Sequence, residues 1–134
     1  MKTRSIGELS LDRVIHERAR LVILSYLAAS DSGEVPFTRL RDELGMTAGN
    51  LSIQLKVLTD AGYVRIDKRF KDRRPFTGAT LTAEGGAALA AYLREIESLI
   101  GSIRDGIDNR EKKRTESEGG DDGGSGTLEN NQDL

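Results

Sequence analysis

A short helix with a clear start and a clear end is predicted near the middle of the chain. Thr47 can cap its first turn, because a threonine hydroxyl accepts hydrogen bonds from the free backbone N–H groups at a helix start. Gly62 follows its last residues and can take the positive φ of a helix C-terminus. Leu51, Leu55 and Leu58 recur every three or four residues and predict one buried face. The opposite face carries mostly small or neutral polar side chains, which favours a helix that lies against another molecule.

A second short helix is predicted immediately before the first one. Residues 39–44 have Thr38 as a cap and are followed by Gly45, which ends the helix after barely two turns. Two short helices joined by a tight turn that contains glycine are typical of a helix-turn-helix. Upstream, the apolar spacing predicts a short amphipathic turn or helix over residues 9–15 and a longer helix over residues 17–29.

A β-hairpin is predicted after the helix-turn-helix, because the period of the apolar residues changes to two. Residues 63–69 alternate apolar and charged side chains and predict a half-buried strand. Residues 70–76, FKDRRPF, predict a charged turn, and residues 79–81 predict the return strand. A very short strand is also expected over residues 35–37, where a proline cannot donate to a sheet. Thr82 is expected to cap the last helix.

The last helix is predicted over residues 83–107 and carries the seam of a coiled coil. Its large apolar residues recur at alternating intervals of four and three residues up to Ile107. We expect this face to pair two copies of the chain, because the seam is longer than so small a domain can cover. The alternative is a helix that packs back onto its own domain. The residues expected at the dimer contact, two of them from the N-terminal turn, are Leu11, Ile15, Leu89, Tyr92, Leu93, Ile96, Leu99, Ile100 and Ile103.

Composition separates the two ends of the chain from its middle. Residues 1–8 are polar and are expected to be flexible. Residues 108–134 form an acidic, glycine-rich tail without an aromatic residue, which is too polar to offset the entropy of an ordered chain. We therefore expect one small folded domain over residues 9–82, the helix over residues 83–107, and a disordered tail.

The net charge of −2 hides a local excess of positive charge. The tail from residue 108 onward holds eight acidic and four basic residues. By contrast, the stretch Thr47–Phe76 holds seven basic residues against three acidic ones, a local charge of +4. Positive charge gathered on one helix and one hairpin indicates an anionic partner such as nucleic acid.

Several classes of function are disfavoured by the residues that the chain lacks. The absence of cysteine excludes disulfides and thiolate metal sites. His16 is the only histidine, so we expect it to be structural, and we expect no metal and no cofactor. No nucleophile elbow, phosphate-binding loop or dinucleotide fingerprint is present, so an enzyme is not expected.

The sequence also bears on location. Its start, MKTRSIGEL, lacks the apolar core of a signal peptide. The longest apolar run begins at Leu21 and is far shorter than the ~20 residues that a membrane span needs. We therefore expect a cytoplasmic protein that has no membrane partner.

Three stretches of the chain resemble winged-helix transcriptional regulators near the MarR and ArsR families. They read HERARLVILSYL, TAGNLSIQLKVLTDAGYV and KRFKDRRPFTGATLTAEG, and the resemblance extends over about residues 9–99. It implies a mainly α fold with a small β-hairpin wing, namely a winged helix-turn-helix with a long C-terminal dimerisation helix. In such regulators the helix that matches residues 47–61 enters the DNA major groove, and the hairpin that matches residues 63–81 is the wing.

The residues expected to contact double-stranded DNA lie on this helix and on the basic wing over residues 68–75. Asn50 and Ser52 can hydrogen-bond base edges, and Ile53 can contact thymine methyl groups. Lys56 is placed to meet phosphate. The full set is Thr47, Asn50, Ser52, Ile53, Gln54 and Lys56 from the helix, and Lys68, Arg69, Lys71, Arg73 and Arg74 from the wing.

Other interpretations of these residues stay open at this point. The side chain of Asn50 can instead bond its own first helical turn. The basic run can be a solvated turn, and Phe76 can either pack under the wing or add an apolar contact.

The leading hypothesis is a homodimeric, sequence-specific DNA-binding regulator. The alternative is a winged-helix module that binds a protein and not DNA. A further idea is a small-molecule effector in an apolar cavity at the dimer interface, enclosed by residues near Leu11, Ile15, Tyr92 and Ile96.

Overall fold

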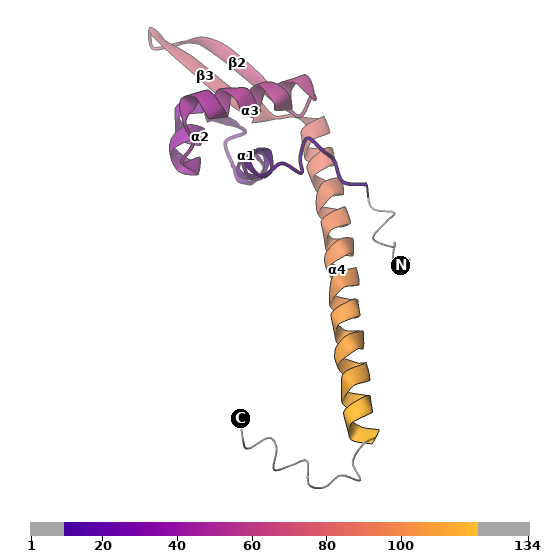
Figure 1. Ribbon diagram of the computed structural model, residues 1–134. Helices are drawn as coiled ribbons and strands as arrows, with labels where there is room; N and C mark the ends of the chain where they lie inside the picture. Colours follow the sequence, from indigo (N-terminus) through magenta and orange to yellow (C-terminus); the bar gives the residue numbers. More distant parts are fainter. Residues whose placement is uncertain (1–9, 121–134) are drawn as a thin grey trace, which may run out of the picture. The chain divides into compact units, whose positions relative to one another are not determined.

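The computed structural model describes residues 10–120, so the predictions for residues 1–8 and for residues 121–134 lie outside the described part of the chain. Residues 9–96 belong to one compact unit, and the part of the last helix from Glu97 belongs to a second. In chain order, the elements are α1 (Arg18–Ala29), β1 (Glu34–Pro36), α2 (Phe37–Leu44), α3 (Ala48–Asp60), β2 (Val64–Lys71), β3 (Arg74–Leu81) and α4 (Ala83–Gly120) (Figure 1).

Three strands form one antiparallel sheet in the order β1-β3-β2. β2 and β3 pair along their whole length, from Val64 opposite Leu81 to Lys71 opposite Arg74, and form a hairpin. β1 is a short strand on the other edge of β3. A helix-turn-helix made of α2 and α3, followed by such a hairpin and a long helix, is a winged helix-turn-helix. The predicted fold class is therefore confirmed.

Most of the predicted helix boundaries are confirmed by the hydrogen bonds of the caps. The Thr47 hydroxyl accepts from the backbone N–H of Asn50 at 3.1 Å, and Thr82 caps α4 in the same way at 2.9 Å. Gly45 ends α2 with a φ of 64°, and Gly62 follows α3 with a φ of 84°. Only glycine takes this left-handed conformation at little cost, which explains why it stands at both positions.

The start of α2 differs from the prediction. The helix begins at Phe37, and its N-cap is Pro36, whose backbone is extended at φ −62° and ψ 144°. Thr38 was expected to be the cap, but it lies inside the first turn. The fixed φ of proline already suits the residue before a helix, so the helix starts earlier than the threonine indicated.

The residues before α1 form a single hydrogen-bonded turn. One carboxylate oxygen of Asp12 accepts from the backbone N–H groups of Val14 at 2.8 Å and Ile15 at 3.1 Å, and its carbonyl accepts from the backbone N–H of His16 at 2.8 Å. The Tyr63 hydroxyl donates to the other carboxylate oxygen at 2.5 Å. This hydrogen bond raises the pKa of Tyr63 to about 12. The turn is thereby fastened to the start of the wing, and Ile15 enters the core.

The core collects apolar side chains from the helices and the sheet. The predicted inner face of α3 is confirmed, since Leu51 and Leu58 are fully buried and Leu55 is nearly so. This burial fixes which face of α3 points outward. The largest fully buried side chains are Ile15, Ile23, Leu24, Val35, Leu40, Leu51 and Leu58.

The last helix is longer than predicted. α4 continues past Ile107 to Gly120, so the expectation of disorder over residues 108–120 was wrong. The segment consists mainly of arginine, lysine and glutamate, which have high helix propensity. Opposite charges four residues apart, such as Asp108 and Lys112, also favour a helix. Low apolar content therefore did not prevent helix formation here.

The wing is also longer than predicted, because its turn has only two central residues. Asp72 and Arg73 have positive φ values of 52° and 66°. A turn with two left-handed residues matches the twist of the paired strands. The charged turn predicted over residues 70–76 is therefore mostly strand, with β2 ending at Lys71 and β3 starting at Arg74. Such turns usually carry Asn-Gly, which explains why the sequence did not reveal this one.

Candidate nucleic-acid interface

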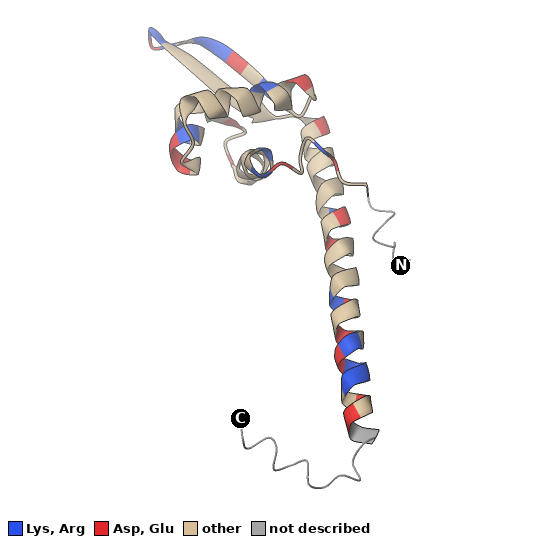
Figure 2. Ribbon diagram, viewed as in Figure 1, with Lys and Arg blue, Asp and Glu red and all other residues tan. Residues whose placement is uncertain are grey.

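The outer face of α3 is exposed and mostly uncharged, as the largely tan ribbon of this helix shows (Figure 2). Asn50 and Ser52 are exposed on it, and Ile53 is 63% exposed. The ammonium group of Lys56 lies 3.2 Å from a carboxylate oxygen of Asp60, in a pair so exposed that it stabilises little. This face therefore offers polar groups, an apolar contact and an available cation on one helix.

Gly49 occupies this outer face although the packing of the chain does not require a glycine there. A Cβ atom at Gly49 would meet nothing within 4 Å. Glycine in a helix costs about 0.5–1 kcal/mol relative to alanine. A bare backbone allows a close approach by another molecule, so this glycine suits a helix that enters a narrow groove.

A groove of about 840 Å³ separates α3 from the hairpin. Its lining includes Ser52, Lys56 and Thr59 from α3, and Ile66 and Lys68 from β2. Two lysines from the two sides of one groove favour a phosphate chain that passes between the helix and the wing.

The hairpin has two faces of different character, because side chains alternate along a strand. Lys68 and Phe70 share one face with Ile66, which lines the groove, whereas Arg69 and Lys71 share the other face. Phe70 is 75% exposed near the end of the wing. The sequence predicts Phe70 in a charged turn. In the structure it lies on β2, and its ring is exposed to solvent.

Phe76 lies beneath two cations of the wing. The guanidinium carbon of Arg69 is 4.5 Å from the ring centroid, and the ammonium nitrogen of Lys71 is 5.1 Å from it. These distances are those of cation–π contacts. Of the two interpretations of Phe76, packing within the wing is the one that the structure has.

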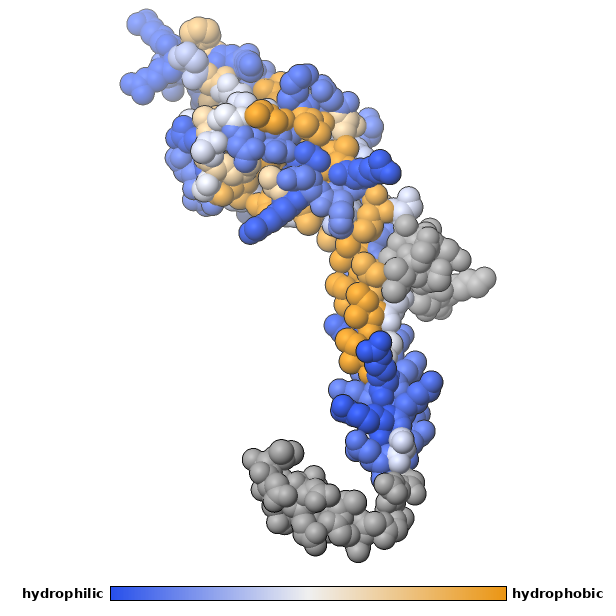
Figure 3. All heavy atoms as spheres, viewed as in Figure 1, coloured by the Kyte–Doolittle hydropathy of each residue, from blue (hydrophilic) through white to orange (hydrophobic). Residues whose placement is uncertain are grey.

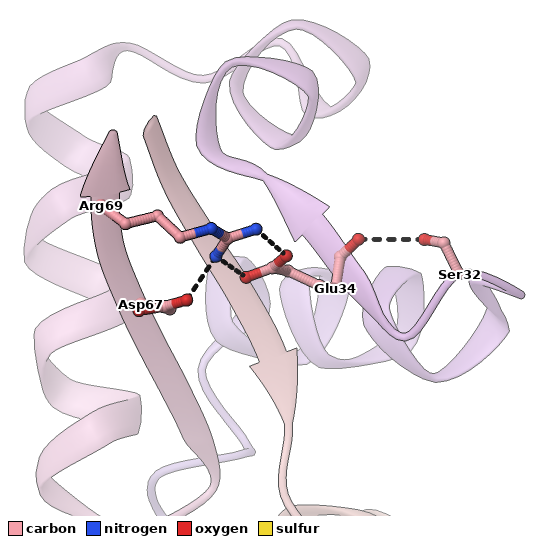
Figure 4. A network of polar contacts seen from close by, with 4 residues as sticks. All are labelled: Ser32, Glu34, Asp67 and Arg69. Atoms are coloured by element: carbon pink, nitrogen blue, oxygen red, sulfur yellow. Dashed lines mark hydrogen bonds and ion pairs between the residues drawn. The ribbon is translucent and has the colours of Figure 1, made fainter. Parts of the chain in front are cut away.

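The exposed side chain of Arg69 is held by contacts within the chain (Figure 4). Its Nη1 and Nη2 atoms each lie 2.9 Å from one carboxylate oxygen of Glu34 on β1, and Nη1 also contacts Asp67. The hydrogen bond from Arg69 lowers the pKa of Glu34, and the same bond raises the pKa of Arg69. A Cβ atom at Gly78 would lie 2.5 Å from the Glu34 carboxylate, so this glycine leaves room for the pair. Sequence reasoning assigned Arg69 to DNA and missed its role in fastening the wing to β1.

The other cations of the wing remain exposed, and Figure 2 shows them as the blue end of the hairpin. Because Arg73 stands in the turn itself, its charge lies at the very end of the wing. The exposed wing cations apart from Arg69 are Arg65, Lys68, Lys71, Arg73 and Arg74.

Gln54 links the outer face of α3 to α1. The carbonyl oxygen of its side chain accepts from Nη1 of Arg20 at 2.9 Å, and its amide nitrogen donates to Oδ1 of Asn50 at 3.2 Å. Arg20 also donates through Nε to the carbonyl of Val14 at 2.7 Å. The cap of α3 uses only the backbone N–H of Asn50, so its side chain is not spent on the first turn. The role of Arg20 was not apparent from the sequence.

The residues predicted at the dimer contact divide into two groups. Ile15, Leu89 and Tyr92 are buried in the core of their own domain, at 0%, 6% and 6% exposure. The Tyr92 hydroxyl also lies 2.8 Å from Nδ1 of His16. Their assignment to a contact between subunits stays a prediction, and these enclosed side chains have little surface to offer a partner.

Four other large apolar side chains of α4 are exposed, and Figure 3 shows a run of hydrophobic side chains along this helix. Those most open to solvent are Leu93 at 48%, Ile100 at 45%, Ile103 at 46% and Ile107 at 54%. The half-buried members of the predicted contact are Leu11, Ile96 and Leu99. The two interpretations of the last helix therefore apply to different parts of it, and pairing with a second copy stays a prediction. Its start packs onto its own domain, whereas the exposed stripe favours a partner.

Residues 10–120 hold no candidate metal site and no candidate membrane span. No three histidine, aspartate or glutamate side chains in this range are grouped so that they could hold a metal ion. Over the same residues, no helix combines the length and the apolar character needed to cross a membrane.

The model of one protein family, the winged helix DNA-binding domain, matches residues 19–100. The chain therefore belongs to the family of winged helix DNA-binding domains. This confirms the predicted resemblance to winged-helix regulators, and the fold and family are those of transcriptional regulators and not of enzymes.

Solved structures with the same fold come from several organisms. A transcriptional regulator homologue from Pyrococcus horikoshii OT3 is 26% identical with a TM-score of 0.66, over 73% of this chain and 95% of that one. A MarR-family regulator from Enterococcus faecalis V583 is 23% identical with a TM-score of 0.54, over 74% and 84%. A mutant MarR from E. coli complexed with operator DNA is 20% identical with a TM-score of 0.52, over 63% and 64%. A search of curated proteins found no match.

Proposed function

We propose that the protein is a homodimeric transcriptional regulator that binds specific sequences of double-stranded DNA. The observation that carries this proposal is the juxtaposition of two surfaces, namely the exposed, largely neutral outer face of α3 and the exposed cations of the wing. A major groove admits a helix whose outer side chains are short, and phosphates attract the cations beside it. The mutant MarR from E. coli that shares the fold is complexed with operator DNA, which supports DNA binding by this chain.

The contacts of α3 divide between bases and backbone. Asn50 and Ser52 are proposed to hydrogen-bond base edges, and Ile53 to contact thymine methyl groups. Lys56 exchanges its exposed partner for a phosphate, at little cost because that pair is weak. Thr47 stands at the start of the helix, where its exposed side chain and the free N–H groups face the backbone of the DNA.

The wing is proposed to bind phosphates or the adjacent minor groove. Lys68, Lys71 and Arg74 supply charge along the strands, and Arg73 supplies it at the turn. Phe70 is the apolar side chain that this surface presents, since Phe76 is already covered by cations. Proteins that bind the minor groove use such rings as wedges against the sugars and bases.

The exposed stripe of α4 is proposed to pair two copies of the chain. A two-fold axis then presents two copies of α3 to half-sites about one helical turn apart, roughly 34 Å. Changing Ile100 and Ile103 to glutamate is expected to yield monomers, which mass measurement in solution reports. A variant that keeps the dimer mass contradicts this part of the proposal and leaves the DNA contacts untouched.

The main experiment is the selection of bound duplexes from a random pool, repeated over a range of salt concentrations. We expect enrichment of one two-fold symmetric sequence, and binding that weakens steeply with salt. Absence of any enriched sequence contradicts an operator-binding function. If a protein partner is retained after Lys71, Arg73 and Arg74 are neutralised while DNA affinity is absent, the protein-binding alternative is the correct one.

A small-molecule effector at the dimer interface stays a prediction. Ile15 and Tyr92 are enclosed in the core, so of the residues expected around it only Leu11 and Ile96 have surface to offer. A thermal-shift screen with operator DNA present tests the idea. A compound that changes operator affinity supports it, and a screen without one contradicts it.

A further inference from the structure

We propose that Arg20 fixes the direction in which Asn50 presents its amide, so that Asn50 reads DNA as a hydrogen-bond donor. This inference rests on the proposed function, in which Asn50 contacts a base. It assigns a positioning role to a residue of α1 that lies outside the helix-turn-helix.

The first step of the argument is the contact between Arg20 and Gln54. A guanidinium group carries donors and no acceptor. Gln54 must therefore turn its carbonyl oxygen toward Arg20, at the observed distance of 2.9 Å. The opposite orientation of the Gln54 amide would place its N–H groups against those of Arg20.

The second step follows from the first. With its oxygen held by Arg20, Gln54 has only its amide nitrogen to offer on the other side, and this nitrogen lies 3.2 Å from Oδ1 of Asn50. Asn50 must accept in this contact. Its own amide nitrogen, with two N–H groups, then has no partner among residues 10–120 and is left for a ligand on the exposed outer face of α3.

This polarity selects among the bases. In the major groove, guanine presents two acceptors, thymine presents one beside its methyl group, and cytosine presents a donor. Asparagine usually reads adenine by accepting from one base atom and donating to another. An Asn50 whose oxygen is turned toward Gln54, and whose N–H groups are left for the ligand, is instead matched to guanine, and next to thymine.

The test compares the base preferences of the full-length wild type and its variants by selection from a random duplex pool. The position that Asn50 contacts is identified as the one whose preference disappears in Asn50→Ala. For the wild type we expect guanine or thymine there, favoured about fivefold or more over cytosine. Adenine or cytosine at this position overturns the inference.

The decisive variant is Gln54→Glu. A carboxylate can accept from Arg20 but cannot donate to Asn50, so the Asn50 amide must turn over and present its oxygen to the DNA. We expect the preference at that one position to move to cytosine or adenine, which carry donors. A Gln54→Glu protein that keeps the wild-type preference overturns the inference.

Arg20→Met provides a second, independent variant, with Arg18→Met on the same helix as its matched control. Removal of the guanidinium frees both amides to turn, so the preference at the Asn50 position should broaden while other positions keep theirs. Thermal unfolding of each variant separates this effect from loss of fold. A uniform loss of affinity in Arg20→Met, without broadening, shows a merely structural role and overturns the inference.

The outcomes also separate this inference from the proposed function. If the wild type enriches no sequence, both are wrong. If it enriches an operator but the Asn50 position does not respond to Gln54→Glu, the operator function stands and the role of Arg20 is rejected.

Discussion

The outer face of α3 and the wing are the two parts of the proposed DNA interface, and they hold their side chains in opposite ways. On α3, the groups that meet bases are restrained by the Thr47 cap and by the bonds from Arg20 through Gln54 to Asn50. On the wing, the cations are exposed; Arg69 is held by an ion pair with Glu34, and Lys71 has only a cation–π contact with Phe76. Restrained polar groups can discriminate between bases, whereas unrestrained charges attract any phosphate. The difference predicts a division of labour between specificity and affinity.

Neutralising the charges of the wing is the strongest test of this difference between the two surfaces. Changing Lys68, Lys71, Arg73 and Arg74 to glutamine should lower the affinity for all duplexes alike, by about 10³-fold or more at 50 mM salt. The slope of log affinity against log salt should become shallower by up to about 3.6, since each phosphate contact contributes about 0.9. Salt-titrated binding measures both. Lys112 and Lys113 on α4, changed to glutamine, serve as the control; an equal effect there shows that net charge alone matters.

Removal of a restrained group should have the opposite signature. Asn50→Ala is expected to lose about 1–3 kcal/mol of discrimination at a single base position and to leave the salt slope unchanged. Competition between the operator and single-base variants reports the discrimination. A loss spread evenly over all sequences contradicts a base-reading role for this side chain.

The two phenylalanines of the wing, Phe70 and Phe76, are expected to differ in their effects on DNA binding and on stability. Phe70→Ala should weaken DNA binding by about five- to tenfold with little change in melting temperature, because the ring is exposed and its proposed contact is with DNA. Phe76→Ala should lower the melting temperature, because that ring packs beneath Arg69 and Lys71. Equal behaviour of the two variants in both measurements is the result that contradicts this distinction.

Gly49 tests whether α3 must approach another molecule closely. Gly49→Ala should raise the free energy of unfolding by up to about 1 kcal/mol, because alanine favours a helix and its methyl group meets nothing in the chain. The same methyl group should weaken operator binding several-fold. Chemical denaturation and operator binding measured on the same preparation decide the matter; a stabilised variant that binds as well as the wild type excludes close approach at this position.

The smallest effect is expected on the melting temperature when the ion pair between Arg69 and Glu34 is removed. The bond from Arg69 lowers the pKa of Glu34 from its ordinary value of 4.5. A lowered carboxylate pKa stabilises the fold above pH 4.5, and this stabilisation is lost as the pH falls through the lowered value. The melting temperature of Glu34→Gln should therefore lie slightly below that of the wild type at neutral pH, and the difference should disappear in acid. A difference that persists below the lowered pKa shows that the ion pair is not its cause.

The features that sequence could predict were those with a local cause. The cap at Thr47, the glycines at Gly45 and Gly62 and the buried leucines of α3 each depend on residues a few positions away. The contacts between Arg20 and Gln54 and between Arg69 and Glu34 join residues 34 and 35 positions apart. Such pairs are set by the packing of α1 against α3 and by the sheet, so no sequence pattern marks them.

Two predictions, for residues 108–120 and for residues 70–76, were wrong because they depended on amino-acid composition alone. The charged residues after Ile107 cannot form a core, and their composition therefore predicts disorder. The helix nevertheless continues through them, because favourable helix propensity is enough to extend a helix beyond the core. The residues around Pro75 are charged and include a proline, and this composition predicts a turn. In the structure these residues instead pair with β2 as part of β3, with Pro75 opposite Phe70. Proline is tolerated at a sheet position that does not need a backbone N–H.

The two-residue turn of the wing carries a consequence for engineering. Asp72 and Arg73 both adopt a backbone conformation that glycine or asparagine takes more readily, at a cost of roughly 1–2 kcal/mol per residue. A sequence optimised only for stability would replace them with Asn-Gly and would remove the cation at the end of the hairpin. A redesign that raises the melting temperature through this turn is therefore expected to weaken the binding of nucleic acid. At these two positions, the residues that favour folding differ from those that favour the proposed binding.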